Sequence, residues 1–518
     1  MPMKLHSLFA LTASVALTAS LNAAGAATPK QPNILWIMSD DHAAEAIGAY
    51  GGILAPLNPT PTLDRLAAEG MRFTNAVVTN SICTPSRATL ITGQYSNVNG
   101  VRTLSDVLPV ANQYLPKQMR EAGYQTAIIG KWHLTSEPAA FDYYCVLPGQ
   151  GKYFNPSFHK KGAGQWPDNI IHTGDNIYDS AHSTDVIADF SLEWLKHRDR
   201  SKPFFLMNHF KAPHDNFENA ERYDFLYDDV TIPEPASMRD VPNYGSEATK
   251  GTGTSVGKRN QRRNMGDHMF VDKSLSDSEY MRVSYQRYMK KYLRCVRGVD
   301  DNVARLLAYL KETGELDNTI ILYTADQGFM LGEHDYIDKR WMYEPSLRVP
   351  FIVRFPGHVA AGSVNDALIN NTDFAPTLLD FAGVKTPDYM QGRSVRPILE
   401  GHTPADWRTA SYYRYWMHMT HHDNPAHYGI RTKDFKLIFF YGLPLDAKDA
   451  LPTPTTPGWE LYDLRKDPDE RHNVYSKPAY AKTVAQLKDQ LLQLKKDAGD
   501  TDEKYPDLVR LWEKTSHP

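Results

Sequence analysis

The chain has 518 residues, of which 42% are hydrophobic and 23% are charged, and its formal net charge at pH 7 is −4. This composition is typical of a soluble globular protein and excludes a disordered or fibrous chain. The small net charge favours neither nucleic acid nor an anionic membrane as a partner, so any anionic ligand must be held by local basic residues.

The N-terminus has the pattern of a secretory signal peptide. Lys4 precedes an apolar stretch from Leu8 to Leu21, and small residues follow as far as Ala26. The apolar stretch contains Thr and Ser, and it is shorter than the ~20 residues that a membrane-spanning helix needs. No later stretch is comparable. We therefore expect residues 1–26 to be cleaved during export to the periplasm or the medium, and we expect no membrane span in the mature chain.

Four short apolar runs read as buried strands, and each leads into polar or charged residues. In parallel α/β sheets the ligand site lies beyond the carboxyl ends of the strands, so these ends predict one shared site. The runs and the residues after them are 33–38 with Asp40 and Asp41, 126–130 with Lys131 and His133, 204–210 with His214, and 319–324 with Asp326 and Gln327.

Helical patterns separate these runs. They lie at 61–68, around 115–122, at 183–196 and at 276–313. Strands that alternate with helices predict an α/β fold, in which a mostly parallel or mixed sheet is covered by helices on both faces. The polar stretch 215–275 interrupts this alternation, and we expect it to be a long surface excursion of the kind that often binds ligands.

The character of the chain changes from about residue 403. Two strand-like runs, 435–441 and 459–464, precede an amphipathic helix at 479–496. This order predicts a small α+β part with an antiparallel sheet. At about 150 residues per domain the length allows several domains, and we divide the mature chain into a large domain, 27–402, and a C-terminal subdomain, 403–518.

The sharpest local motif is Cys-Thr-Pro-Ser-Arg at 83–87, which runs into Thr-Gly at 92–93. Taken alone, Cys83 is either a nucleophile of low pKa or a packed thiol. The pattern C-x-P-x-R followed by T-G resembles the signature of the formylglycine-dependent sulfatases, in which the cysteine is oxidised to formylglycine by a maturation enzyme. The two other cysteines, Cys145 and Cys295, either pair or remain buried thiols.

The resemblance covers nearly the whole mature chain. It implies the alkaline-phosphatase-like fold, a mixed sheet sandwiched by helices with a smaller C-terminal domain, in agreement with the pattern of runs. The matching segments beyond the cysteine motif are Pro-Asn-Ile-Leu at 32–35 with the Asp-Asp pair at 40–41, Gly-Lys-Trp-His at 130–133, Pro-His at 213–214, Asp-Gln-Gly at 326–328, Lys339 and Glu-Leu-Tyr-Asp-Leu at 460–464.

The acidic residues at two strand ends suggest a metal site. Adjacent carboxylates such as Asp40 and Asp41 repel each other unless a cation neutralises them, although an isolated Asp-Asp pair is more often a helix cap or a turn. The resemblance implies that these two residues, Asp326, Gln327 and the modified Cys83 bind Ca²⁺ through oxygen atoms. Most sulfatases carry Asn or His where this chain has Gln327.

The resemblance also assigns the catalytic residues. Arg87, Lys131 and Lys339 supply fixed positive charge for the sulfate group, whose oxygens gain charge as the ester bond breaks. His133 and His214 exchange protons, with His214 as the donor to the departing alcohol. The implied chemistry is covalent catalysis by the modified Cys83, with release of sulfate.

The implied substrate is the sulfate ester of a carbohydrate, namely a sulfated polysaccharide or a glycosaminoglycan fragment. We expect at least one residue of a C-terminal histidine cluster to line the sugar pocket, whereas for the basic run within 215–275 a solvated surface is slightly favoured. Two alternatives are a phosphomonoester or phosphonate hydrolase of the same superfamily and a catalytically silent glycan-binding protein. The histidine cluster is His418, His421, His422 and His427, and the basic run is Lys258, Arg259, Arg262 and Arg263.

Overall fold

The protein is described here from a computed structural model, in which residues 1, 31–173, 181–240 and 244–515 are placed. The chain from Pro32 onward forms one compact unit. Residues 2–26 of the expected signal peptide lie outside the described residues. Within the described ranges, no helix combines the length and the apolar character needed to cross a membrane.

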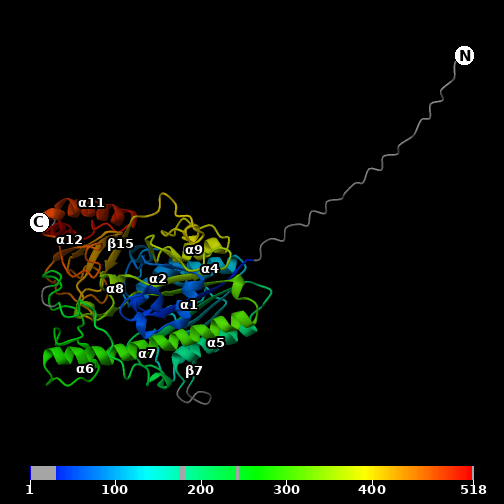
Figure 1. Cartoon of the computed structure of the whole chain (residues 1–518). Coiled ribbons are helices and arrows are strands. Elements are labelled where there is room, and N and C mark those ends of the chain that lie inside the picture. The colour runs from blue at the N-terminus through cyan, green and yellow to red at the C-terminus, as the bar shows by residue number, and fades with distance from the viewer. Residues whose placement is uncertain (2–30, 174–180, 241–243, 516–518) are drawn as a thin grey trace. The chain divides into compact units, whose positions relative to one another are not determined.

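A ten-stranded mixed sheet runs through this unit in the order β13-β2-β12-β9-β1-β8-β4-β5-β6-β7 (Figure 1). The central strands β9, β1, β8, β4 and β5 are parallel, so their carboxyl ends meet at one edge, while β12 joins β9 antiparallel. The strands are β1 (Asn33–Asp40), β2 (Met71–Phe73), β4 (Gln125–Lys131), β5 (Tyr143–Leu147), β6 (Ser157–Lys160), β7 (Ile170–His172), β8 (Phe204–Pro213), β9 (Thr319–Ala325), β12 (Phe351–Arg354) and β13 (Ser363–Asn365).

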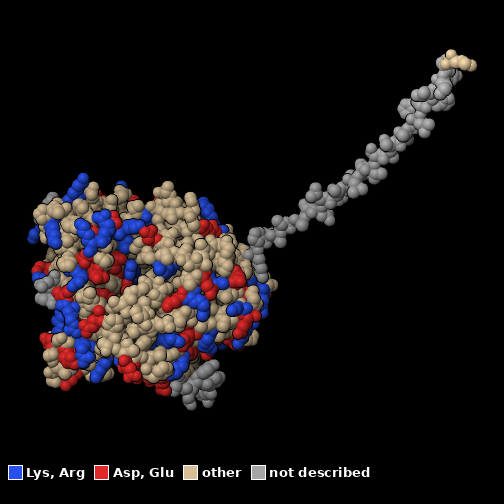
Figure 2. Space-filling model, in the orientation of Figure 1, with Lys and Arg blue, Asp and Glu red and all other residues tan. Residues whose placement is uncertain are grey.

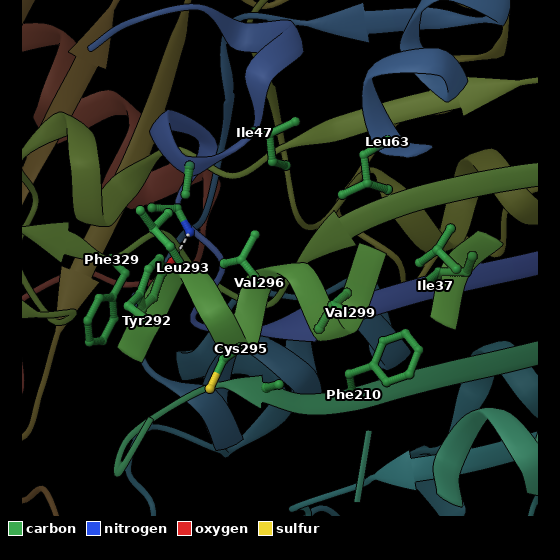
Figure 3. Close-up of a cluster of buried hydrophobic side chains, with 14 of the residues drawn as sticks. Ile37, Ile47, Leu63, Phe210, Tyr292, Leu293, Cys295, Val296, Val299 and Phe329 are labelled. Carbon is green, nitrogen blue, oxygen red and sulfur yellow. Dashed lines mark hydrogen bonds between the residues drawn. The ribbon is translucent and has the colours of Figure 1, made fainter. Parts of the chain in front are cut away.

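Helices cover both faces of this sheet because successive side chains of a buried strand point to opposite sides. In β1, Leu35 and Ile37 pack into the core on one face, and Trp36 packs into the core on the other. Figure 3 shows part of the first core, in which α7 lies against Ile37 and Phe210. The first face carries α1 (Pro61–Glu69), α5 (Ser183–His197) and α7 (Asp277–Glu312), and the second carries α2 (Cys83–Thr92), α4 (Tyr114–Glu121) and α9 (Phe374–Phe381).

The C-terminal part contains a separate four-stranded antiparallel sheet in the order β15-β16-β17-β18. One face packs under α11 and α12, and the other face contributes to a core that includes Ile82, the residue before Cys83. The sheet therefore supports the segment that carries the cysteine motif. Its elements are β15 (Ala410–Tyr415), β16 (His427–Thr432), β17 (Phe435–Phe440), β18 (Gly458–Asp463), α11 (Ala481–Asp497) and α12 (Pro506–Thr515).

The remaining elements are short. They are β3 (Ala76–Val77), β10 (Met330–Leu331), β11 (Ile337–Asp338), β14 (Ile369–Asn370), α3 (Ser96–Asn99), α6 (Met265–His268), α8 (Glu344–Leu347) and α10 (Arg396–Leu399). On the face seen in Figure 2, acidic and basic side chains are mixed, in keeping with the small net charge.

The expected fold class is confirmed: a large mixed sheet is flanked by helices, and a small antiparallel sheet lies in the C-terminal part. Cys145 in β5 and Cys295 in α7 are both free and buried, so the alternative of two buried thiols is correct. Burial raises the pKa of each of these thiols to about 12, which keeps both protonated.

One buried ion pair fastens the end of the chain to the small sheet. Arg414 lies in β15, its Nη1 is 2.8 Å from Oδ1 of Asp500, and its guanidinium stacks 3.7 Å from the ring centroid of Trp416. Both charged residues are buried. We expect Arg414→Leu to lower the free energy of unfolding by about 3 kcal/mol in urea denaturation, because Asp500 loses its charged partner inside the protein and keeps, among the described residues, only the hydrogen bond from Tyr412.

The matched control is Arg465→Leu. Arg465 follows β18, is mostly exposed, and contacts Asp434 and Asp463 only at 3.6 Å. An exposed ion pair contributes at most about 1 kcal/mol, so this variant is expected to unfold close to the wild-type urea concentration. Equal losses in the two variants would contradict a special role for the buried pair.

Candidate active site

The expected strand-end residues meet at one edge of the sheet. Asp40 is the last residue of β1, Lys131 is the last of β4, His214 directly follows β8, and Asp326 directly follows β9. Cys83 is the first residue of α2 and is 1% exposed, and its Sγ lies 3.5 Å from Oδ1 of Asp40. The parallel arrangement of the central strands therefore brings together residues that are far apart in the sequence.

Three carboxylates form the centre of this cluster. Oxygen atoms of Asp40, Asp41 and Asp326 lie within 4.8 Å of one another, and all three residues are fully buried. Nε2 of Gln327 donates to Oδ1 of Asp41 at 2.6 Å, while its Oε1 is buried without a hydrogen-bond partner among the described residues. Three carboxylate groups and an unpaired amide oxygen are a donor set that suits a hard cation such as Ca²⁺.

Basic side chains surround the carboxylates. Lys131 contacts Asp40, and its Nζ is also 3.9 Å from Sγ of Cys83. Nζ of Lys339 donates to Oδ2 of Asp41 at 2.6 Å. Arg87 lies one helical turn after Cys83 in α2, and its Nε donates to Oδ2 of Asp326 at 2.9 Å.

These charges shift the pKa values of the acidic groups in opposite directions. Burial alone raises the pKa of Asp40, but Lys131 and His214, together with two further cations, hold it well below its usual range. Burial raises the pKa of Asp326 to about 8, with Asp40 adding to the rise. Burial and neighbouring charge therefore act on Asp40 and Asp326 in opposite directions.

Burial also raises the pKa of Cys83 to about 12, and the negative charge of Asp40 adds to this rise. A reactive cysteine needs a thiolate, and a thiol of such high pKa is protonated at neutral pH. Cys83 in its unmodified form is therefore a poor nucleophile at this position.

Two contacts position the ends of β1 and β4. Asp41 has a positive φ of 63°, and the hydroxyl of Tyr292 in α7 holds its turn, donating to the Asp41 carbonyl at 2.8 Å and accepting from the Ala43 amide at 2.9 Å. At Gly130, a Cβ would lie 1.9 Å from the carbonyl oxygen of His209, so only glycine allows β4 to approach β8 just before Lys131.

The two histidines of the motif segments differ in position. His214 lies at the cavity wall, where its Nδ1 is 2.6 Å from Oδ1 of Asp215 and its Nε2 is 3.7 Å from Oδ2 of Asp41. His133 is half-buried behind Lys131, and its Nδ1 has no hydrogen-bond partner among the described residues. Burial, together with Lys131, lowers the pKa of His133 well below its usual range, so this ring is neutral.

A polar cavity of about 410 Å³ opens over Cys83, Lys339 and His214. Several of its lining residues were not among those expected from the sequence, because no motif or periodic pattern marks them. Gln150 accepts a hydrogen bond from Nζ of Lys131 at 2.6 Å, which a sequence pattern does not reveal. The lining residues missed in this way are Gln150, Lys211, Asp215, Asp338 and Arg340.

The C-terminal histidine cluster divides into two pairs. His421 and His422 line the cavity, and His422 is also 2.9 Å from Oγ1 of Thr254. His418 and His427 are fully buried and do not line it. Nε2 of His418 lies 3.0 Å from the Thr453 carbonyl oxygen, and His427 stacks among aromatic rings, so both belong to the packing of the small sheet.

The basic run divides similarly. Arg263 lines the cavity, and Arg262 lies beside it. Arg259 instead pairs with the buried Asp335 at 3.0 Å, and Lys258 lies 3.2 Å from Asp277 at the start of α7. A solvated surface therefore does not describe the whole run, because part of it borders the candidate site.

Comparison with known families identifies the chain. The family model described as sulfatase matches residues 32–384, and the model described as N-sulphoglucosamine sulphohydrolase, C-terminal, matches residues 332–497. The chain belongs to the sulfatase family. It is a sulfuric ester hydrolase, and the comparisons favour this activity over the phosphatase and binding-protein alternatives.

Several relatives resemble this sulfatase over most of its length. N-acetylglucosamine-6-O-sulfatase of Bacteroides thetaiotaomicron is 40% identical, over 93% of this chain and 90% of the relative. Human N-acetylglucosamine-6-sulfatase is 28% identical, over 74% of this chain and 67% of the relative. The structure of BT4656 in complex with its substrate, D-glucosamine-2-N,6-O-disulfate, matches with a TM-score of 0.81 and 38% identity, over 92% of this chain and 99% of that chain.

Proposed function

We propose that this sulfatase removes the 6-O-sulfate group from a glucosamine unit of a sulfated glycan. The observation that carries the proposal is the polar cavity of about 410 Å³, which has Cys83 and Lys339 at its wall and His421, His422 and Arg263 around it. Its size and polar lining suit a sugar ring with a charged substituent. The names of two relatives and the bound substrate of the similar structure support glucosamine and the 6-position.

We further propose that Ca²⁺ occupies the carboxylate cluster. Asp40, Asp41, Asp326 and Gln327 would hold it through oxygen atoms. When bound, Ca²⁺ would supply positive charge that neutralises the cluster and attracts an anionic substrate group.

Cys83 is proposed to be converted to formylglycine by a maturation enzyme. The high pKa of the buried thiol supports the proposal, because the unmodified residue would be protonated at neutral pH. The aldehyde supplies, as its hydrate, one hydroxyl for attack on sulfur and a second for release of sulfate.

The remaining residues bind the substrate and move protons. Arg87, Lys131 and Lys339 are fixed in place by ion pairs with the carboxylates, so they would hold the sulfate oxygens without reorganisation. Nε2 of His214 faces the cluster while Asp215 contacts its Nδ1, an arrangement that suits a proton donor to the departing alcohol. The proposed role of His133 as a proton acceptor rests on the family resemblance alone, because a ring of lowered pKa is a weak base.

The proposed place of action is outside the cytoplasm. The pattern of residues 1–26 supports a signal peptide that directs export to the periplasm or the medium.

The substrate is tested with defined sulfated sugars. We expect sulfate release, followed by ion chromatography, from glucosamine 6-sulfate and from oligosaccharides that end in it, and at least about 100-fold lower kcat/KM on 2-O- or 3-O-sulfated isomers. Aryl phosphate serves as the control for the phosphatase alternative. Preference for another sulfate position would overturn the assignment to the 6-position but not to the sulfatase family.

His422→Ala tests the sugar-binding role of the histidine pair. The side chain lies at the cavity wall beside Thr254 and Asp338. We expect kcat/KM on the sulfated sugar to fall about tenfold relative to kcat/KM on a small aryl sulfate, the effect of one or two lost hydrogen bonds. His402→Ala, at an exposed histidine outside the cavity, is the control. Equal losses on the two substrates would refute a specificity role for His422.

A further inference from the structure

A second cavity adjoins the first and shares one wall with it. Its volume is about 270 Å³, below the roughly 300–1,000 Å³ of a site for a drug-sized ligand, so it suits a single additional sugar unit. The shared wall contains His421, His422 and Arg263. A molecule bound over Cys83 can therefore extend into the second cavity without leaving the protein surface.

Two arginines at the second cavity share a single carboxylate as their ion-pair partner. Arg262 and Arg263 both pair with one carboxylate, that of Asp423, at 3.1 Å and 3.3 Å. Asp423 is nearly buried and also accepts a hydrogen bond from Nδ2 of Asn260 at 3.0 Å. One carboxylate neutralises only one of the two guanidinium groups, and the Arg262 side chain is 79% exposed, with donors free to bind another anion.

The acidic residues that line this cavity are each engaged by a neighbouring group. Asp215 pairs with His214, Asp338 contacts Arg340, and Asp267 lies 2.9 Å from Nζ of Lys273. The guanidinium groups of Arg262 and Arg263 are thus the donors left for an anion.

The other part of the wall is apolar. Phe217, Phe329 and Ile337 line it and are buried. A lining that combines apolar and charged side chains suits a sugar ring, which has an apolar face and charged or hydroxyl substituents at its rim.

We propose that the second cavity binds the sugar unit next to the one being desulfated, through an anionic group on that unit that contacts Arg262 and Arg263. The proposal rests on the proposed function and extends it. The enzyme acts on the end of an acidic glycan chain and prefers substrates whose neighbouring unit is negatively charged. The neighbouring unit is a uronate or another anionic sugar.

The test compares two disaccharides and two protein variants. Both disaccharides end in 6-sulfated glucosamine, linked either to a uronate or to a neutral hexose. We expect the wild-type enzyme to have the higher kcat/KM on the uronate substrate. In Arg262→Gln, the ratio of the two kcat/KM values should fall about two- to fivefold, the effect of one lost exposed ion pair. Arg262→Lys keeps the charge and should retain most of the ratio.

The matched control is Arg282→Gln. Arg282 is an exposed arginine of the neighbouring helix α7, paired within that helix with Glu279, and outside both cavities. The Arg282→Gln substitution removes the same charge from the protein and should leave the ratio of the two kcat/KM values unchanged. The wild-type ratio should also fall as NaCl is raised from about 0.05 to 0.5 M, because salt screens an exposed ion pair.

The outcomes separate this proposal from the proposed function. An unchanged ratio in Arg262→Gln, or an equal fall in Arg282→Gln, would overturn the second-cavity proposal. Absence of sulfate release from every substrate would instead overturn the proposed function. In that case the second cavity is tested by titration calorimetry of the unsulfated uronate disaccharide against wild-type and Arg262→Gln protein. Equal affinities for the two proteins would overturn the second-cavity proposal.

Discussion

Cys83→Ala is expected to abolish sulfate release, with kcat at least about 10⁴-fold below that of the wild-type enzyme, as for other enzymes that lose their nucleophile. Alanine has no thiol that could be oxidised, so its side chain cannot become the aldehyde of the proposed formylglycine. The surrounding basic side chains should still bind the substrate. The measurement is single-turnover and steady-state sulfate release, with substrate binding followed by calorimetry. Cys83→Ser should fail as well, wherever the maturation system accepts only cysteine.

The matched control is Cys145→Ala, which removes a different buried thiol, in β5. This variant should retain the wild-type kcat. Peptide mass spectrometry of active wild-type protein should show residue 83 lighter than cysteine by roughly 18 Da, the difference between a thiol and an aldehyde carbon. Full multiple-turnover activity of Cys83→Ala, or an unmodified cysteine in fully active enzyme, would contradict the proposed mechanism.

Removal of divalent cations is expected to have an effect of similar size. The carboxylates of Asp40, Asp41 and Asp326 lie within 4.8 Å of one another in a fully buried cluster, so a cation lowers their repulsion and holds the site in shape. Dialysis against EDTA should lower kcat/KM at least about 10³-fold, and added Ca²⁺ should restore it. Because the cation binds the folded protein, Ca²⁺ should also raise the melting temperature in calorimetry.

Asp326→Asn provides the matched variant for the cation experiment. It removes one charge from the cluster with little change of shape, so Ca²⁺ should stabilise it less than the wild-type protein and restore little activity. If the EDTA-treated protein keeps full activity, contains no divalent cation by metal analysis and melts at the same temperature with or without Ca²⁺, the proposed metal site is wrong.

The fold was predictable because its central strands are buried and its long helices are periodic. The run at 33–38 corresponds to β1, and the long helical pattern at 276–313 corresponds to α7. The rule that ligand sites lie beyond parallel strand ends grouped Asp40 and Asp41 with Asp326. In the structure the amide of Asp41 donates to Asp326, although the two residues are 285 positions apart. The cysteine motif then placed Cys83 beside them.

The rest of the site was not predictable from local patterns. His418 and His422 are close in the sequence, yet one is fully buried in the small sheet and the other lines the cavity. That difference depends on how a loop turns between strands, and no periodicity marks it. The same holds for Gln150, which follows β5 in a loop and contacts Lys131 across the cavity wall.

The burial of Cys83 would set a time limit on its proposed conversion to formylglycine. The residue is 1% exposed in the folded protein, and its surroundings include Gln327, Lys339 and the C-terminal sheet, all of which are synthesised later. About 250 residues separate Cys83 from Lys339, and a ribosome that adds roughly 5–20 residues per second needs roughly 10–50 s for that stretch. The proposed conversion would compete with the folding of the exported chain. If folding outpaced the maturation enzyme, the product would be a mixture of converted and permanently enclosed cysteine, even though every molecule is correctly folded.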